Sequence, residues 1–295
     1  MKILLIYFTG TYNTKFVTNI LKNRFINENN IVDVVEVNID TPIVDLNDYD
    51  IIGFGYPIYA FNSPNIFNKY LRKLKLPNDK RYFIYKNSGE TLKYNDASSR
   101  VIWKILKKQK CAITNEYHII MPYNIHFRFD DRFVKEILGY LDKQIEIIVY
   151  DLMNEKESKI HANIGLKLIS CFYTIQRLGG PINSLFYKID YTKCIKCNKC
   201  LNNCPVHNIK INNDKYKFGR KCIMCMRCSF YCPKDAIKIG LYNKWRVNGE
   251  YNFESIKNNN DLELPYITNE SKGFYKCFLK TFKEIDERYG EIINK

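Results

Sequence analysis

The sequence predicts an α/β fold, namely a doubly wound, five-stranded parallel sheet, followed by a small α+β domain that binds metal. Two observations predict it. Strand-like and helix-like segments alternate over the first half, and two cysteine runs of identical spacing lie between Cys194 and Cys232. Because 295 residues are enough for two ordinary domains, we expect domains at 1–155 and 189–240, a helical connector at 156–188 and a C-terminal extension at 241–295.

Five apolar segments of the first half have the length and composition of strands. They are KILLIYF at 2–8, IVDVVEVN at 31–38, DIIGFGYPIY at 50–59, RYFIYKNS at 81–88 and EYHIIMP at 116–122. The helix-like segments between and after them are 14–25, 63–74, 98–108 and the long amphipathic 130–152. Ser63 is the expected N-cap of the second helix, with Pro64 at its first position. Such alternation predicts a parallel sheet with helices on both faces.

Three loops leave the carboxyl ends of the first, third and fourth strands, where sheets of this kind bind ligands. The expected ligand residues are Thr9, Gly10, Thr11, Tyr12, Asn13 and Thr14; Tyr56, Pro57, Ile58, Tyr59, Ala60 and Phe61; and Asn87, Ser88, Gly89 and Glu90. The first loop offers hydroxyls and helix N-terminal amides to a phosphate, the second offers flat aromatic faces, and the third offers polar atoms. Together they suit flavin mononucleotide (FMN). Each loop alone is also consistent with ordinary helix caps and packed tyrosines.

The loops GFGYPIYAFNSP, FIYKNSGE and MPYNIHFRF resemble those of flavodoxins, and more closely those of flavodoxin-ferredoxin fusion proteins of anaerobic bacteria. The resemblance covers residues 1 to about 240. It implies a flavodoxin-like sheet and noncovalently bound FMN with its phosphate on residues 9–14. The sequence departs from the flavodoxin phosphate loop at Tyr12, which takes the place of a glycine. If that position requires φ > 0, the tyrosine costs about 1 kcal/mol or more.

The second half contains an internal duplication. CIKCNKCLNNCP at 194–205 is repeated as CIMCMRCSFYCP at 222–233, and one constant shift relates Cys194 to Cys222 and every later cysteine of the first run to its counterpart in the second. Both runs read C-x-x-C-x-x-C-x-x-x-C-P. Structural zinc also uses CxxC pairs, but two four-cysteine runs, each followed by proline, fit tetrahedral zinc sites poorly.

Residues 189–240 resemble bacterial two-cluster ferredoxins, in which the fourth cysteine of each run binds the other cluster. The resemblance implies low-potential electron transfer by two [4Fe-4S] clusters. The expected ligands are Cys194, Cys197, Cys200 and Cys232 for one cluster, and Cys222, Cys225, Cys228 and Cys204 for the other. Near them, Lys196, Lys199, Arg227 and Lys234 are expected to form a solvated rim.

The net charge of +15 raises the question of nucleic-acid binding. Two oxidised clusters and a flavin phosphate would lower the charge to roughly +9, and the lysines are scattered. A surface for acidic redox partner proteins is the better interpretation, with no nucleic acid. The N-terminus lacks the pattern of an export signal, and no apolar run is long enough to span a membrane. We therefore expect a cytoplasmic protein.

These features predict an electron-transfer protein that couples two [4Fe-4S] clusters to FMN. An alternative is an FMN-dependent reductase of a small acceptor such as a quinone, fed by the clusters. A third is an iron-sulfur sensor or nucleic-acid-binding protein. The sequence does not decide between carrier and enzyme. It predicts no catalytic residue, and it does not identify the electron donor, the electron acceptor or the oligomeric state.

The remaining segments are less informative. The apolar segment 163–178, which a GGP sequence is expected to stop, predicts a helix between the domains; packing on its own protein is the commoner fate of such helices, and docking to a membrane surface is the alternative. The extension beyond residue 241 is expected to cap the ferredoxin unit or to mediate self-association. Cys111, Cys171 and Cys277 are expected to be core thiols.

Overall fold

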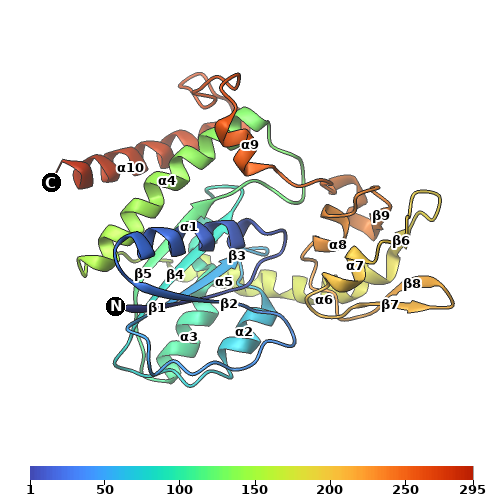
Figure 1. Ribbon diagram of the computed structural model, residues 1–295, viewed down its shortest axis with the longest axis horizontal. Helices are drawn as coiled ribbons and strands as arrows, with labels where there is room; N and C mark the ends of the chain where they lie inside the picture. The colour runs from blue at the N-terminus through green and yellow to red at the C-terminus, as the bar shows by residue number, and fades with distance from the viewer. Residues whose placement is uncertain (295) are drawn as a thin grey trace.

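The structure is a computed structural model that describes residues 1–294 (Figure 1). Its first half contains β1 (Lys2–Tyr7), α1 (Asn13–Asn27), β2 (Ile31–Glu36), β3 (Ile51–Pro57), α2 (Asn65–Leu71), β4 (Arg81–Ser88), α3 (Arg100–Lys108), β5 (Ile113–Ile120) and α4 (Asp131–Met153). The second half contains α5 (Ile164–Phe172), α6 (Gln176–Asn183), β6 (Tyr187–Ile189), α7 (Lys199–Asn202), β7 (Ile209–Asn212), β8 (Lys215–Phe218), α8 (Arg227–Phe230), β9 (Ile237–Ile239), α9 (Phe253–Asn258) and α10 (Lys276–Ile293).

The first half is built on one parallel sheet of five strands in the order β2-β1-β3-β4-β5. This is the flavodoxin-like order, in which ligands bind at the switch point between β1 and β3, where the order of the strands in the sheet reverses. All seven residues of β3 are buried, as expected for a strand that is covered on both faces. The predicted fold class is confirmed.

Two separate hydrophobic cores flank the sheet. One contains residues of α1 and α4, and the other contains residues of α2 and α3. Helices therefore cover both faces, and the carboxyl ends of the strands are left for the ligand loops. Helix α2 begins one residue later than expected, because Pro64 is its N-cap and Ser63 instead donates to Asn68 Oδ1 at 2.8 Å.

The small domain repeats its backbone along with its sequence. The short helices α7 and α8 begin at Lys199 and Arg227, which are equivalent positions of the two cysteine runs. The positive φ angles of Lys196 (51°) and Asn198 (59°) recur at Met224 (53°) and Met226 (59°). Pairs of antiparallel strands, β6 with β9 and β7 with β8, complete the unit around Tyr187, Met226, Ile237 and Ile239. The duplication is therefore structural.

The C-terminal extension packs mainly on the flavodoxin-like domain. Helices α9 and α10 lie along α4 (Figure 1). The Tyr140 and Phe282 rings stack at 3.9 Å between centroids, and Lys143 Nζ lies 2.5 Å from Asp286 Oδ1. The expectation of a cap on the ferredoxin unit is wrong for these two helices, because their apolar residues join the core on the α4 side.

The end of the connector helix and the burial of two isolated cysteines differ from expectation. The GGP sequence does not stop a helix, since Pro181 lies inside α6, which continues to Asn183. Of the three cysteines outside the repeat, Cys111 is buried as expected, but Cys171 and Cys277 are exposed. Among residues 1–294, no helix is long and apolar enough to cross a membrane.

Candidate cofactor sites

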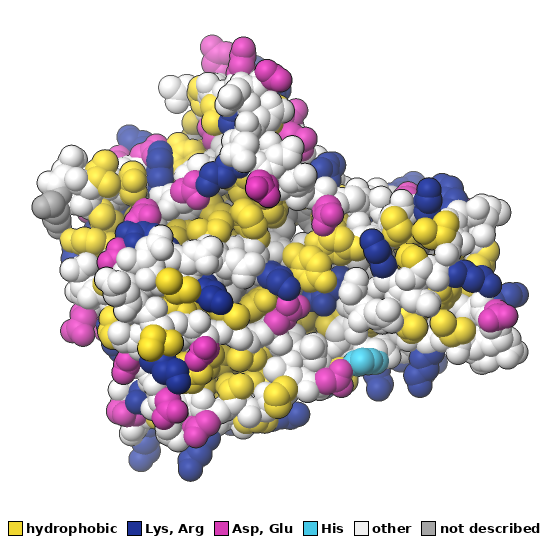
Figure 2. All heavy atoms as spheres, viewed as in Figure 1, with side chains coloured by type: hydrophobic (Ala, Val, Ile, Leu, Met, Phe, Trp, Pro, Cys, Tyr) yellow, Lys and Arg dark blue, Asp and Glu magenta, His cyan; other side chains and the backbone are white. Residues whose placement is uncertain are grey.

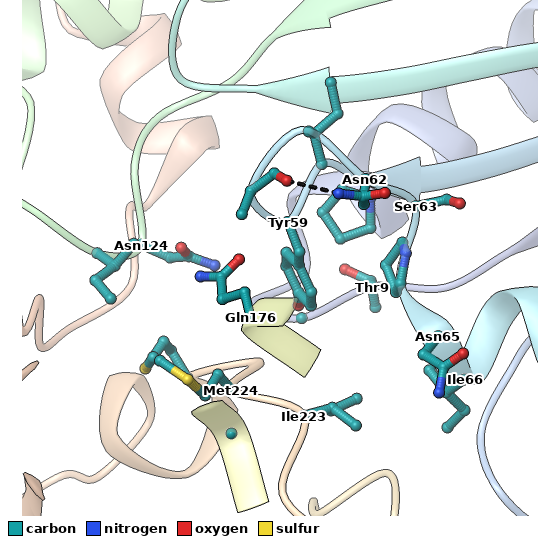
Figure 3. Close-up of a pocket in the computed structure, with 18 of the residues that line it drawn as sticks. Thr9, Tyr59, Asn62, Ser63, Asn65, Ile66, Asn124, Gln176, Ile223 and Met224 are labelled. Carbon is teal, nitrogen blue, oxygen red and sulfur yellow. Dashed lines mark hydrogen bonds between the residues drawn. The ribbon is translucent and has the colours of Figure 1, made fainter. Parts of the chain in front are cut away.

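One cavity of about 1120 Å³ lies between the ligand loops of the sheet and the small domain. From the predicted loops it is lined by Thr9, Gly10, Thr11, Asn13 and Thr14, by Pro57, Ile58, Tyr59, Ala60 and Phe61, and by Asn87, Ser88, Gly89 and Glu90. Figure 3 shows Thr9 and Tyr59 on one side of this cavity, and Ile223 and Met224 of the small domain facing them. Protein pockets for small molecules commonly measure about 300–1000 Å³, so the space is ample for a flavin.

The lining of the cavity fits a phosphorylated aromatic ligand. Thr9 Oγ1 and the Tyr59 hydroxyl are buried without a hydrogen-bond partner, which is costly unless a ligand satisfies them. Burial raises the pKa of Tyr59, so its hydroxyl stays protonated and can donate. On the opposite side of the first loop, Thr14 donates to Asn87 Oδ1 at 2.7 Å and so joins the first loop to the third.

Two of the predicted flavin residues do not line the cavity. Tyr56 is fully buried in the core beside Phe67, with its hydroxyl 3.2 Å from Ser98 Oγ. Tyr12 has φ 66°, which is the left-handed conformation that the glycine position requires. Its ring lies 4.9 Å from the ring of Tyr231 in the small domain. The tyrosine therefore replaces glycine at a contact between the two domains.

Comparing two substitutions of Tyr12 should separate its strain from its packing. We expect Tyr12→Ala to lower the free energy of unfolding by about 1–2 kcal/mol, because the ring contact is lost while the strained φ is kept. Tyr12→Gly should lower it by about 1 kcal/mol less, since glycine accepts φ > 0. Urea titration measures both values. Equal losses in the two variants would show that the φ angle stores no strain.

Several cavity residues were not expected from the sequence. Tyr123 packs over Gly89, where an added Cβ would lie 2.3 Å from the tyrosine ring, and its hydroxyl bonds Glu90. His126, Met224 and Trp245 also line the cavity. Tyr123 and His126 belong to the MPYNIHFRF loop, for which the sequence favours a solvated loop over a place beside the flavin. Met224 and Trp245 are brought in by the small domain, a placement that no local pattern reveals.

The first cysteine set comes together as expected. Cys194, Cys197, Cys200 and Cys232 line one small pocket of the small domain. Cys197 is exposed, and the other three are partly exposed. Burial raises the pKa of Cys200 to about 11, and the neighbouring thiols of the same set add to the shift. Cluster assembly would therefore release protons from these thiols.

The second set is buried more deeply. Burial raises the pKa of Cys222 to about 12, and the nearby thiols of Cys225 and Cys204 add to the shift. Burial likewise raises the pKa of Cys228, with contributions from Cys225, Cys222 and Cys204 and from Cys200 of the first set. The thiol of Cys204 therefore acts electrostatically on all three cysteines of the other run.

A zinc site and a cubane cluster hold their cysteine sulfurs at different distances from one another. Four thiolates around one Zn²⁺ ion lie about 4 Å from one another, whereas in a cubane each cysteine binds a different iron and the sulfurs are further apart. Within residues 1–294, no group of three or more Cys, His, Asp or Glu residues is arranged to hold a single metal ion.

Arg227 joins the second cysteine run to the first ligand loop, residues 9–14. Its guanidinium donates to Thr9 O at 2.7 Å and to Gly10 O at 2.9 Å, and it pairs with Glu36 at 3.3 Å. The expectation that Arg227 belongs to a solvated rim is wrong, because the side chain is buried, while Lys196, Lys199 and Lys234 are exposed. A Cβ on Gly10 would lie 2.9 Å from Cys225 O, so the two loops are in backbone contact.

One side of the cavity is cationic. Its lining includes Lys69, Arg72, Lys73, Arg177, Arg220 and Lys221, and its only acidic residue among those described is Glu90. Arg177 Nη2 is buried without a hydrogen-bond partner. Burial lowers the pKa of Arg177, and the positive charges of Arg100 and Arg72 lower it further. This arrangement favours an anionic ligand.

Comparison with known proteins gives one family match and several structural likenesses. Residues 186–233 match the 4Fe-4S dicluster domain family. Oxidised flavodoxin 1 from Bacillus cereus is 17% identical with a TM-score of 0.36, covering 50% of this chain and 98% of its own. A short-chain flavodoxin associated with a bacterial microcompartment is 21% identical with a TM-score of 0.35, covering 50% and 95%. A putative quinone reductase from Klebsiella pneumoniae is 12% identical with a TM-score of 0.37, covering 54% and 86%.

These structural likenesses are weak, so the fold assignment depends on the strand order β2-β1-β3-β4-β5. No protein of curated function matches the sequence. The chain joins a flavodoxin-like domain to a 4Fe-4S dicluster ferredoxin domain. This is the domain combination that the sequence predicted.

Proposed function

We propose that the protein transfers electrons between two [4Fe-4S] clusters and one FMN. One observation carries the proposal. The three ligand loops line one side of the cavity, and Cys222, Ile223 and Met224 of the second cysteine run line the other. A flavin in this cavity and a cluster on the second run would be close neighbours. Clusters carry single electrons and flavin takes one or two, so the pair would convert between one- and two-electron steps.

In this proposal the chain's own residues fix the spacing and the surroundings of the cofactors. The expected phosphate site is residues 9–14, with Thr9 Oγ1 free to bond a ligand. Arg227 and the close approach of Gly10 to Cys225 hold the second run against that loop. Ile223 and Met224 of the second run present apolar side chains to the cavity, which limits water between the cavity and the cysteines. The exposed lysines near the first run would meet acidic redox partners.

The direct test is anaerobic purification with iron, sulfide and flavin measured per chain. We expect about eight iron atoms and one FMN, as two cubanes and one flavin site require. Cys232→Ser should remove the cluster of Cys194, Cys197 and Cys200 and leave about four iron atoms. Cys111→Ser, outside both sets, is the matched control. Four or fewer iron atoms in the fully reconstituted parent protein would contradict the two-cluster proposal.

A second candidate is an FMN-dependent reductase of a small acceptor. The size of the cavity, about 1120 Å³, favours it, because space is left for a small acceptor beside the flavin. Turnover of soluble quinones or nitro compounds that is lost in Tyr59→Ala, but kept when Lys196 is changed, would support the reductase. Absence of turnover with any small acceptor would support the carrier.

A further inference from the structure

The connector carries a long apolar stripe on its exposed side. Seven large hydrophobic side chains are between 52% and 76% exposed: Ile164, Leu168, Phe172, Ile175, Leu178, Ile182 and Phe186. Their spacing of three or four residues puts them on one side of the consecutive helical segments of residues 164–186, which are α5, α6 and the 3-10 turn that follows each of them. At about 1.5 Å per residue the stripe is about 33 Å long. Single exposed hydrophobic residues are common, but a continuous row of this length marks an interaction surface.

The side of the connector that faces the protein is small and polar. Ser170, Asn183 and Ser184 are almost fully buried. Ser170 donates to Phe61 O at 2.7 Å, Asn183 donates to Ile239 O at 3.1 Å, and Ser184 donates to Gly219 O at 2.6 Å. A surface helix of a globular protein normally turns its apolar side inward. Here the polarity is reversed, so the outer side requires a covering of its own.

The charge of the connector and the small domain indicates which partner would cover the apolar stripe. No Asp or Glu occurs between Glu157 and Asp190, and residues 156–240 contain sixteen Lys and Arg against four Asp and Glu. Figure 2 shows Lys and Arg side chains spread over the small domain on the face in view. A second copy of the chain would bring like charge to this surface, which disfavours self-association. An anionic lipid surface supplies both the apolar layer and the opposite charge.

We propose that the exposed side of α5 and α6 docks onto the surface of an anionic lipid bilayer, with the helices lying in its plane. The hydrogen bonds of Ser170, Asn183 and Ser184 hold these helices to both domains, while the apolar stripe enters the lipid. The docked surface lies close to the second cysteine run, because a Cβ on Gly180 of α6 would lie 2.6 Å from Cys222 O. The proposal does not depend on the proposed electron-transfer function.

The test is sedimentation of the cofactor-loaded protein with two kinds of vesicle, one of phosphatidylcholine mixed with a smaller share of phosphatidylglycerol and one of phosphatidylcholine alone. We expect binding to the anionic vesicles that weakens as salt is raised. Phe172→Ser combined with Leu178→Ser should weaken binding at least tenfold, because both side chains would be removed from the lipid. Ile293→Ser is the matched control, since Ile293 and Leu178 are both 63% exposed.

Three results would overturn the proposal. One is no binding of the parent protein to anionic vesicles at low salt. Another is equal binding of the parent and the double variant, or equal binding to both kinds of vesicle. The third is a dimer in sedimentation velocity that the double variant abolishes, which would make a second copy the occupant. Iron and flavin contents equal to those of the parent show that the double variant is folded.

Discussion

Lys86→Met is expected to lower the free energy of unfolding by about 3–5 kcal/mol, because it leaves a buried carboxylate without its counter-charge. Lys86 and Glu116 are both fully buried, with Nζ and Oε1 2.6 Å apart. Lys86 Nζ also donates to Asn95 O at 2.9 Å, which fixes the segment after the third flavin loop. Thermal and urea unfolding, followed by circular dichroism, measure the loss.

Two controls make this result specific. Lys143→Met breaks an ion pair whose side chains are 37% and 46% exposed, so it should cost less than about 1 kcal/mol. Lys86→Met combined with Glu116→Gln removes both charges. Ser99 Oγ and Trp103 Nε1 donate to different oxygens of Glu116, so the glutamine oxygen can accept from Trp103 while its NH2 group donates to the Ser99 hydroxyl. We expect the double variant to recover much of the loss. A loss below about 1 kcal/mol in Lys86→Met alone would show that Glu116 tolerates its isolation.

Arg227→Met is expected to lower the free energy of unfolding by about 2–4 kcal/mol and to reduce the flavin bound after purification. The substitution leaves the buried carbonyls of Thr9 and Gly10 without a donor and leaves Glu36 without its partner. Both carbonyls belong to the expected phosphate loop. Arg227→Lys should recover only part of the loss, because an ammonium cannot donate to both carbonyls in the forked geometry of arginine.

Arg227 is expected both to stabilise the fold and to support flavin binding. Urea unfolding measures the first effect, and the iron and flavin contents measure the second. Flavin should fall while about eight iron atoms are retained, since the thiols are unchanged. Arg132→Met, at an exposed arginine, is the control and should change neither quantity. A variant with full flavin content and unchanged stability would show that Arg227 does not hold the two loops together.

The features predicted well from the sequence are those with a local or periodic signal. Buried strands followed by helices fixed the sheet, and the repeat of the cysteine runs appears again in the φ angles of Asn198 and Met226. The three ligand loops lie at the expected edge of the sheet because connectivity alone brings the carboxyl ends of parallel strands together. Most of the expected flavin residues line the cavity for the same reason.

The features that were missed depend on contacts between distant segments. A lysine or arginine among cysteines looks like a solvated charge, and only the docking of the two domains buries Arg227 against Thr9, 218 residues away in sequence. Tyr56 was expected to face the flavin, but strand alternation turns it into the core and leaves Tyr59 at the cavity. The outward side of the connector was missed because apolar periodicity does not say which side of a helix the protein covers.

The unequal burial of the two cysteine sets has a consequence for damage. Cys197 of the first set is exposed, whereas Cys225 of the second is buried behind Gly10 and Arg227. If both clusters are present, oxygen and chelators reach the first set before the second. Air would then produce a half-loaded protein that keeps the inner cluster beside the flavin. Four iron atoms per chain in a sample handled in air would therefore reflect the earlier loss of the first cluster. Only an iron count made without oxygen tests how many clusters the protein binds.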